Sequence, residues 1–343
     1  MSVFTRHRPP ASAPAPVPTP AEARGGADGP AGGRPGGSGP ARRRTVARRA
    51  RPVPGTRIPR GMRGPVAVSL LPGLVLFGTF FLVPFLVLTA TAFARWSGLD
   101  FGWTGLDNYR QMLADPVFLK ALVNTLFYAA ASVFVQVPLG VGVGMVLALR
   151  PRGWKTLRTI VFVPFVISGA AYALVFSMFY NPRAGLLNNV LGGLGLPGRD
   201  WLFDTATARW AVAGTFVFII GFVVVLVMAE VASIPRELYE AASVDGASTW
   251  QQLTRITLPL LRNVIGTAIL IRLLVDIGMF DLVFILTAGG PDDATATLAL
   301  YAYRAYLNGE WGFANAVGSV IIVIGLVLIV TVRRVFRIGE RAL

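Results

Sequence analysis

The sequence contains no cysteine, one histidine and only two lysines, and these absences exclude several kinds of site. Without cysteine the chain forms neither disulfides nor thiolate metal sites, and the lone His7 cannot build a histidine cluster. A nucleotide-binding loop needs the pattern G-x4-G-K-[ST]. Lys155 precedes Thr156, but Trp154 stands where that pattern requires glycine. We therefore expect no metal site, no catalytic residue and no ATPase activity in this chain.

Charge is scarce as well, since 14% of the 343 residues are charged and 54% are hydrophobic. Six apolar segments are long enough to cross the hydrocarbon core of a bilayer, which takes about 20 helical residues. They are expected at 66–94, 121–149, 159–181, 210–230, 263–287 and 312–332. Because a helix satisfies its own backbone groups in lipid, residues 65–343 are predicted to form an all-α, multi-pass protein of the cell membrane.

Positive charges are distributed unevenly between the two sides of the predicted bundle. The first 64 residues contain 13 arginines. Outside this tail, the segments on the same side hold 11 lysines and arginines, against 7 on the opposite side. Positively charged flanks stay in the cytoplasm, so both termini and the polar link 235–261 are expected there.

Residues 1–64 form a separate segment that is expected to be disordered. They hold 12 of the 24 prolines and only two acids, Glu22 and Asp28. Such a segment cannot bury enough apolar surface to offset the entropy cost of folding. No aromatic residues are interleaved with its clustered arginines to stack on bases. A role at the anionic membrane surface is therefore favoured over nucleic-acid binding.

The polar link 235–261 is longer than a simple connection between two spans requires. Gly246 suits the left-handed position that follows a helix C-terminus. Ser248 and Gln251 have the spacing of a capping box at the start of a second helix, and Pro259 is expected to break or kink that helix. The link therefore predicts a helix, a tight turn and a second helix before the chain re-enters the membrane.

The same link contains the pattern E-A-A-x3-G-x9-I-x-L-P. It resembles the cytoplasmic EAA loop in permease subunits of binding-protein-dependent ABC importers. In that family the loop is a pair of short helices that docks into a groove on the ATPase subunit. The resemblance implies this coupling role for Glu240, Ala241, Ala242, Asp245, Gly246, Ile256, Leu258 and Pro259.

The resemblance extends from about Pro65 to the end of the chain. Segments 105–129, 280–307 and 309–320 resemble parts of sugar-type permeases, of the maltose and glycerol-phosphate type. This implies import of a sugar or sugar-like solute, driven by a dimer of ATPase subunits that binds ATP and Mg. A second homologous permease subunit and an extracellular solute-binding protein are also implied. The chain itself is expected to hold no cofactor.

Ionisable groups inside membrane spans are costly and often functional. Arg272 and Asp276 lie four residues apart on one face of the fifth predicted span, and Asp281 follows about one turn later. They are interpreted either as lining the solute path, or as an internal ion pair or a contact to the second permease. The further polar candidates for the solute path are Asn124, Gln136 and Tyr172.

Three other functions remain open at this point. In an ion-coupled secondary transporter, Asp276 or Asp281 would bind the coupling ion, although repeat symmetry between the two halves is not evident. A membrane-tethered regulator would bind nucleic acid through the basic tail. A membrane enzyme would need an acid–base constellation that the spans do not show.

Overall fold

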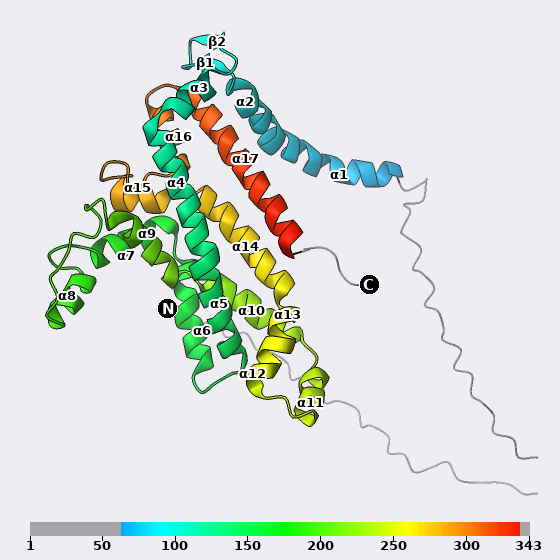
Figure 1. Cartoon of the computed structure of the whole chain (residues 1–343). Helices are drawn as coiled ribbons and strands as arrows, with labels where there is room; N and C mark the ends of the chain where they lie inside the picture. The colour runs from blue at the N-terminus through cyan, green and yellow to red at the C-terminus, as the bar shows by residue number, and fades with distance from the viewer. Residues whose placement is uncertain (1–62, 337–343) are drawn as a thin grey trace, which may run out of the picture. The chain divides into compact units, whose positions relative to one another are not determined.

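The computed structural model describes residues 63–336, with side chains from Val68 onward. Residues 1–62, nearly all of the predicted disordered tail, and residues 337–343 lie outside the described residues. The described chain is dominated by α-helices, with one short hairpin of two antiparallel strands (Figure 1). The predicted all-α membrane architecture is thus confirmed.

The helices that precede the polar link cover the first two thirds of the described chain. They are α1 (Arg63–Phe77), α2 (Val83–Thr91), α3 (Asp107–Ala114), α4 (Pro116–Ala131), α5 (Val137–Ala148), α6 (Trp154–Val166), α7 (Gly169–Phe179), α8 (Leu186–Gly193), α9 (Ala208–Thr215) and α10 (Gly221–Ser233). The link and the remaining chain form α11 (Arg236–Val244), α12 (Thr249–Gln252), α13 (Leu258–Leu260), α14 (Arg262–Ile277), α15 (Asp281–Thr287), α16 (Leu298–Leu307) and α17 (Trp311–Phe336). Strands β1 (Ala94–Trp96) and β2 (Phe101–Trp103) pair with Ala94 opposite Trp103.

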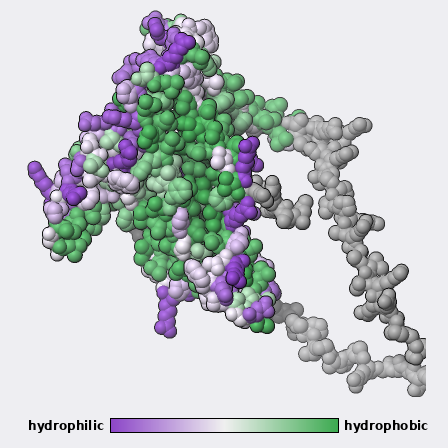
Figure 2. Space-filling view, in the orientation of Figure 1, coloured by the Kyte–Doolittle hydropathy of each residue, from purple (hydrophilic) through white to green (hydrophobic). Residues whose placement is uncertain are grey.

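Four helical stretches in the described chain are long and apolar enough to cross a membrane, and two bent pairs raise the number to six if each pair is one span. The four stretches are Val68–Thr91, Pro116–Ala148, Ala208–Ser233 and Trp311–Phe336. In Ala208–Ser233 a short 3-10 turn, Phe216–Phe218, and two non-helical residues separate α9 from α10. The bent pairs are Trp154–Val166 with Gly169–Phe179, and Thr249–Leu260 with Arg262–Ile277. Figure 2 shows a broad hydrophobic band across the middle of the visible face, with hydrophilic residues gathered toward its ends. The chain is a multi-pass membrane protein.

The third predicted span, 159–181, is not one straight helix in the structure. Its two halves, α6 and α7, meet at an angle of 105°. Ile167 is extended at the break, and the Ser168 side chain accepts a hydrogen bond from the Ala171 N–H. A polar N-cap of this kind satisfies a backbone donor that a new helix would leave open. Ser168 therefore allows the chain to stop and restart a helix inside an apolar segment.

The fifth predicted span, 263–287, is also divided in the structure. α14 ends just before Gly278, and α15 begins at Asp281. Between them the Met279 carbonyl accepts a hydrogen bond of 2.9 Å from the Thr297 hydroxyl. Asp281 consequently lies on a different helix from the two other ionisable groups of the predicted span.

At three of the prolines within helical stretches of the described chain, a π-helical turn lies just before the proline, whereas Pro72 in α1 and Pro164 in α6 have no such turn. The pairs are Gly78–Leu82 before Pro84, Ser132–Gln136 before Pro138, and Leu253–Thr257 before Pro259. Proline has no N–H and its ring clashes with a carbonyl of the preceding turn, and a wider π turn accommodates both effects. The break or kink predicted at Pro259 is a bend of 59° that follows α13.

α5 and α10 pack closely through two glycines. Gly140 and Gly144 have the G-x-x-x-G spacing that is typical of close helix contact in membranes. A Cβ atom added at Gly140 would lie 2.6 Å from the Cβ of Val223, and one at Gly144 would lie 2.8 Å from the Cβ of Val227. Cβ atoms essentially never come so close, so this contact inside the bundle requires both glycines.

Replacing Gly144 with valine is expected to lower the melting temperature of the detergent-purified protein, because overpacking costs about 1–3 kcal/mol. Gly142→Val is the matched control, since a Cβ atom at Gly142 meets nothing within 4 Å. Thermal unfolding of the two variants measures the difference. Equal melting temperatures for both would contradict the α5–α10 contact.

Candidate functional site

Residues 236–260, called here the helix pair, form a braced unit that lies at one end of the helical bundle (Figure 1). Its first helix, α11, ends in a Schellman motif. The Ala247 N–H donates to the Ala242 carbonyl at 2.9 Å, and the Gly246 N–H donates to the Ser243 carbonyl at 3.1 Å. Gly246 has φ +77°, a conformation that glycine adopts without the steric cost of a side chain. The predicted turn is confirmed.

The second helix of the pair begins at the predicted capping box. The Ser248 N–H donates to Gln251 Oε1 at 2.8 Å, and the Gln251 N–H donates to Ser248 Oγ at 3.3 Å. The two helices are also joined across the turn, because the hydroxyls of Tyr239 and Thr257 lie 2.9 Å apart. The helix pair is therefore held in shape by its own side chains.

The surface of the helix pair combines charged groups with large exposed apolar side chains. Val244 is 88% exposed and Trp250 is 70% exposed. Large apolar groups left open beside polar ones are typical of protein interfaces. Of the predicted coupling residues, Ala242 and Ile256 are half-buried, and the exposed ones are Glu240, Ala241, Asp245, Gly246, Leu258 and Pro259. Val244 and Trp250 were not among the predicted residues, although large apolar residues in a polar link are a recognisable signal.

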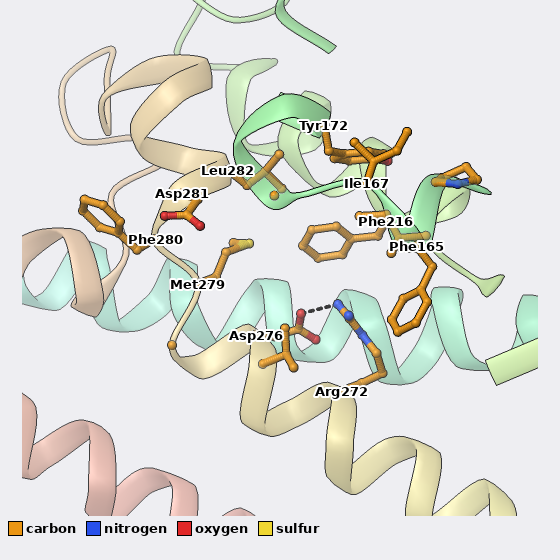
Figure 3. Close-up of a pocket in the computed structure, with 15 residues that line it drawn as sticks. Phe165, Ile167, Tyr172, Phe216, Arg272, Asp276, Met279, Phe280, Asp281 and Leu282 are labelled. Atoms are coloured by element: carbon orange, nitrogen blue, oxygen red, sulfur yellow. Dashed lines mark hydrogen bonds and ion pairs between the residues drawn. The ribbon is translucent and has the colours of Figure 1, made fainter. Parts of the chain in front are cut away.

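A second candidate site is a pocket of about 370 Å³ where three helix breaks meet (Figure 3). The α6–α7 break contributes Ile167, the α9–α10 break contributes Phe216 and Ile219, and the α14–α15 break contributes Met279 and Phe280. Interrupted helices around a cavity are a recurrent way for membrane transporters to expose backbone and polar groups to a solute. The position of this pocket therefore matches a transport function.

Arg272 and Asp276 line this pocket and bond to each other, as Figure 3 shows. Arg272 Nη2 lies 2.5 Å from Asp276 Oδ1, and the two residues are only 7% and 1% exposed. The internal ion pair that was one interpretation of these residues is thus present. Arg272 Nε and Asp276 Oδ2 are buried without a hydrogen-bond partner in the described chain. Since buried polar atoms are nearly always bonded, these two retain capacity to bind water or solute.

Asp281 lines the same pocket from the first turn of α15 and forms no ion pair with a described residue. Its side chain lies close to the α6–α7 break, since a Cβ atom added at Gly169 would be 3.4 Å from Asp281 Oδ2. The rings of Phe165, Phe216 and Phe280 line the pocket with it. A free carboxylate among aromatic rings can accept hydrogen bonds from hydroxyl groups that enter the pocket.

Two predicted path residues satisfy backbone carbonyls at the α9–α10 break. The Tyr172 hydroxyl donates to the Thr215 carbonyl at 2.6 Å, and Gln136 Nε2 donates to the Ile219 carbonyl at 2.8 Å. In a membrane such carbonyls need a protein partner wherever helical bonding stops. Tyr172 also lines the pocket, whereas Gln136 does not.

Asn124 lies outside the pocket and holds the segment that follows α15. Its Nδ2 donates to the carbonyls of Asp293 and Ala296 at 3.2 and 2.9 Å. The Asp293 carboxylate in turn lies 2.5 Å from Arg304. The structure thus brings Arg272, Asp276, Asp281 and Tyr172 to one pocket and leaves Asn124 and Gln136 outside it.

Comparison with known proteins identifies the family. Residues 136–343 match the binding-protein-dependent transport system inner membrane components. The chain is 35% identical over 283 residues to the probable ABC transporter permease protein YurN of Bacillus subtilis, and this match covers 79% of this chain and 95% of that protein. It is 34% identical over 287 residues to the diacetylchitobiose uptake system permease protein NgcF of Streptomyces coelicolor, and this match covers 78% of this chain and 81% of that protein.

A solved structure agrees with these sequence matches. It is a chain of a bacterial alginate ABC transporter in complex with an alginate pentasaccharide-bound periplasmic protein, with a TM-score of 0.71 and 27% identity. The match covers 80% of this chain and 96% of that chain. These findings confirm the resemblance carried by the E-A-A pattern and favour an importer over the ion-coupled transporter, the regulator and the enzyme. The chain belongs to the family of binding-protein-dependent transport system inner membrane components.

Proposed function

We propose that the chain is the permease subunit of an ABC importer that carries a sugar or sugar-like solute into the cell. The observation that carries the proposal is the exposed helix pair, which is braced internally and offers both apolar and charged contacts. ATP hydrolysis takes place on a separate subunit. The solute class is supported by the relatives, one of which serves diacetylchitobiose uptake while another belongs to an alginate transporter.

The helix pair is the element through which a dimer of ATPase subunits, with its bound ATP and Mg, moves the bundle. Glu240 offers a carboxylate to a basic group on the ATPase, and the small side chains of Ala241 and Ala242 allow close approach. Val244 and Trp250 add exposed apolar area. Exposed apolar residues contribute most of their binding energy when a partner buries them completely.

The helix pair and both termini face the cytoplasm, in agreement with the distribution of positive charge. The opposite end of the bundle, which contains the β1–β2 hairpin and α3 (Figure 1), then faces outward and meets the solute-binding protein. The complex of the alginate transporter with its periplasmic protein supports a partner of this kind.

A second, homologous permease subunit completes the membrane part of the transporter. The most apolar part of the first span, Val68–Thr91, buries none of its residues within this chain. α2 packs on α17, whereas α1 extends away from the other helices (Figure 1). The second permease and surrounding lipid cover the apolar surface that this leaves open.

The pocket at the three helix breaks belongs to the solute path. Asp281 accepts hydrogen bonds from solute hydroxyls, and the unpaired atoms of Arg272 and Asp276 supply one donor and one acceptor. The rings of Phe216 and Phe280 provide flat apolar surfaces for the faces of a sugar ring. A few placed polar groups on an apolar lining are the usual composition of a small-molecule site.

The absence of cysteine allows the orientation of the helix pair to be tested by a single introduced thiol. Glu240→Cys is expected to crosslink to a thiol on the ATPase subunit in the assembled transporter and to resist impermeant thiol reagents added to intact cells. The control is Leu99→Cys in the β1–β2 hairpin, where the side chain is fully exposed, and it is expected to be labelled from outside. Labelling of Glu240→Cys from outside would contradict the proposed coupling role.

Gly246→Val is expected to uncouple ATP hydrolysis from uptake, because a left-handed conformation costs a residue with a side chain roughly 1–2 kcal/mol. The variant should therefore hydrolyse ATP without a matching rate of solute uptake in proteoliposomes. Gly195→Val is the matched control, since Gly195 has φ +75° and Gly246 has φ +77°, and an added Cβ atom meets nothing within 4 Å at either position. Equal uptake per ATP in the two variants would count against the helix pair as the coupling element.

Asp281→Asn is expected to reduce solute uptake about tenfold or more without lowering the melting temperature, because a hydrogen bond to a charged group contributes ~1.5–3 kcal/mol. The carboxylate has no ion-pair partner to lose among the described residues. Uptake by the reconstituted transporter and thermal unfolding give the two readouts. Asp100→Asn, which changes an exposed acid near the hairpin, serves as the control. Normal uptake by Asp281→Asn would exclude Asp281 from the solute path.

A further inference from the structure

A groove of about 980 Å³ separates the helix pair from the ends of α5, α6 and α10. Three arginines line it, Arg150, Arg158 and Arg236, and no aspartate or glutamate is among its lining residues. The rest of the lining is mainly apolar and includes Met145, Met228 and Leu253. The lining of the groove therefore combines positively charged side chains with mainly apolar ones.

None of the three guanidinium groups forms an ion pair or hydrogen bond with a described residue. The guanidinium carbons of Arg150 and Arg158 each lie 5.6 Å from the centre of the Trp154 ring. Each guanidinium is thus attracted to the same ring through a cation–π interaction. Arg150 takes this position with a φ of +53°, a left-handed conformation that costs an L-residue energy. Three arginines without an acidic partner along one groove favour an anionic occupant.

A second cavity of about 470 Å³, called here the apolar channel, adjoins the groove along α6. The two cavities share the lining residues Arg158 and Val225, and the channel is lined further by Phe162, Val163 and Val166. The last three residues belong to the predicted third span, 159–181, so the channel lies on the side of the groove that faces the hydrocarbon region. A basic groove thus has an apolar cavity beside it.

We infer that this groove and channel bind one anionic phospholipid, with its phosphate between Arg150, Arg158 and Arg236 and an acyl chain along α6. Basic pockets between membrane helices on the cytoplasmic side are a known setting for anionic headgroups. The apolar channel joined to the basic groove favours a lipid over a free phosphate or a peptide. Tryptophan beside the headgroup suits the membrane–water boundary.

The position of the lipid connects the membrane to the helix pair. Tyr239, Trp250 and Leu253 of the helix pair line the groove together with Trp154 of the α5–α6 side. A lipid held there fills the space behind the helix pair and stabilises its position on the bundle. Lipid binding is measured on the chain itself, so its outcome is separate from that of the proposed transport function.

The test is native mass spectrometry of the full-length chain titrated with dioleoylphosphatidylglycerol and, separately, with dioleoylphosphatidylcholine. Arg150→Gln/Arg158→Gln is expected to raise the apparent Kd for phosphatidylglycerol roughly 25-fold, about fivefold for each arginine at ~1 kcal/mol per basic residue. Arg152→Gln/Lys155→Gln removes the same charge from the same segment, 150–158, but neither residue lines the groove. This control is expected to bind as the unmodified chain does.

Two further arms distinguish the lipid from other occupants. Val163→Trp fills the apolar channel and is expected to weaken phosphatidylglycerol binding while all three arginines remain. Millimolar inorganic phosphate is expected not to displace the lipid, and displacement would assign the groove to a free anion instead. Equal loss of binding in the two charge variants, or equal affinity for phosphatidylcholine, would overturn the site. An acidic segment of a partner subunit found in the groove would overturn it as well.

Discussion

Every backbone N–H and C=O inside a membrane span needs a hydrogen-bond partner within the protein, because hydrocarbon offers none. In the described part of the chain the helices of the third, fourth and fifth predicted spans are interrupted, and at each interruption a side chain bonds to the backbone. Ser168 caps α7, and Tyr172 and Gln136 bond to carbonyls at the α9–α10 break. Thr297 bonds to the Met279 carbonyl between α14 and α15. The polar residues of the spans therefore serve first to make broken helices possible.

The same constraint separates structural polar groups from candidate functional ones. Tyr172 and Gln136 donate hydrogen bonds to backbone carbonyls of the protein itself. Four buried polar atoms of the described side chains have no hydrogen-bond partner: Asn124 Oδ1, the Tyr128 hydroxyl, Arg272 Nε and Asp276 Oδ2. Arg272 and Asp276 line the pocket where the breaks meet, together with Asp281, whereas Asn124 and Tyr128 do not. The pocket at the interruptions thus holds the unsatisfied atoms of a buried ion pair and a carboxylate without an ion-pair partner among the described residues, and groups of this kind can bond to a hydroxylated solute.

The helix pair could be predicted closely from the sequence because its signals are local. A glycine at the end of α11 and the Ser248–Gln251 capping box act over three or four residues, and both are observed. The breaks in the third and fifth predicted spans could not be predicted in this way. At the break in the fifth span the bonding partner is distant in sequence, since Thr297 lies 18 residues from Met279. At the break in the third span the Ser168 cap is local, but an average of hydropathy along the chain passes over a single serine. The pocket was missed for the same reason, although three of its ionisable residues were recognised.

The helix pair and the pocket are connected by two helices, α10 and α14. α10 runs from the α9–α10 break to the helix pair, and α14 runs from the helix pair to the α14–α15 break. Their 13 and 16 residues span about 20 and 24 Å at 1.5 Å per residue. Val223, Leu261 and Ile269 belong to one buried cluster that packs the two helices together. Since a packed helix is stiff and a break is not, a displacement of the helix pair is expected to be taken up at the breaks. The proposed solute pocket lies at these breaks, so in the proposed mechanism a force applied to the helix pair at one end changes the pocket at the other.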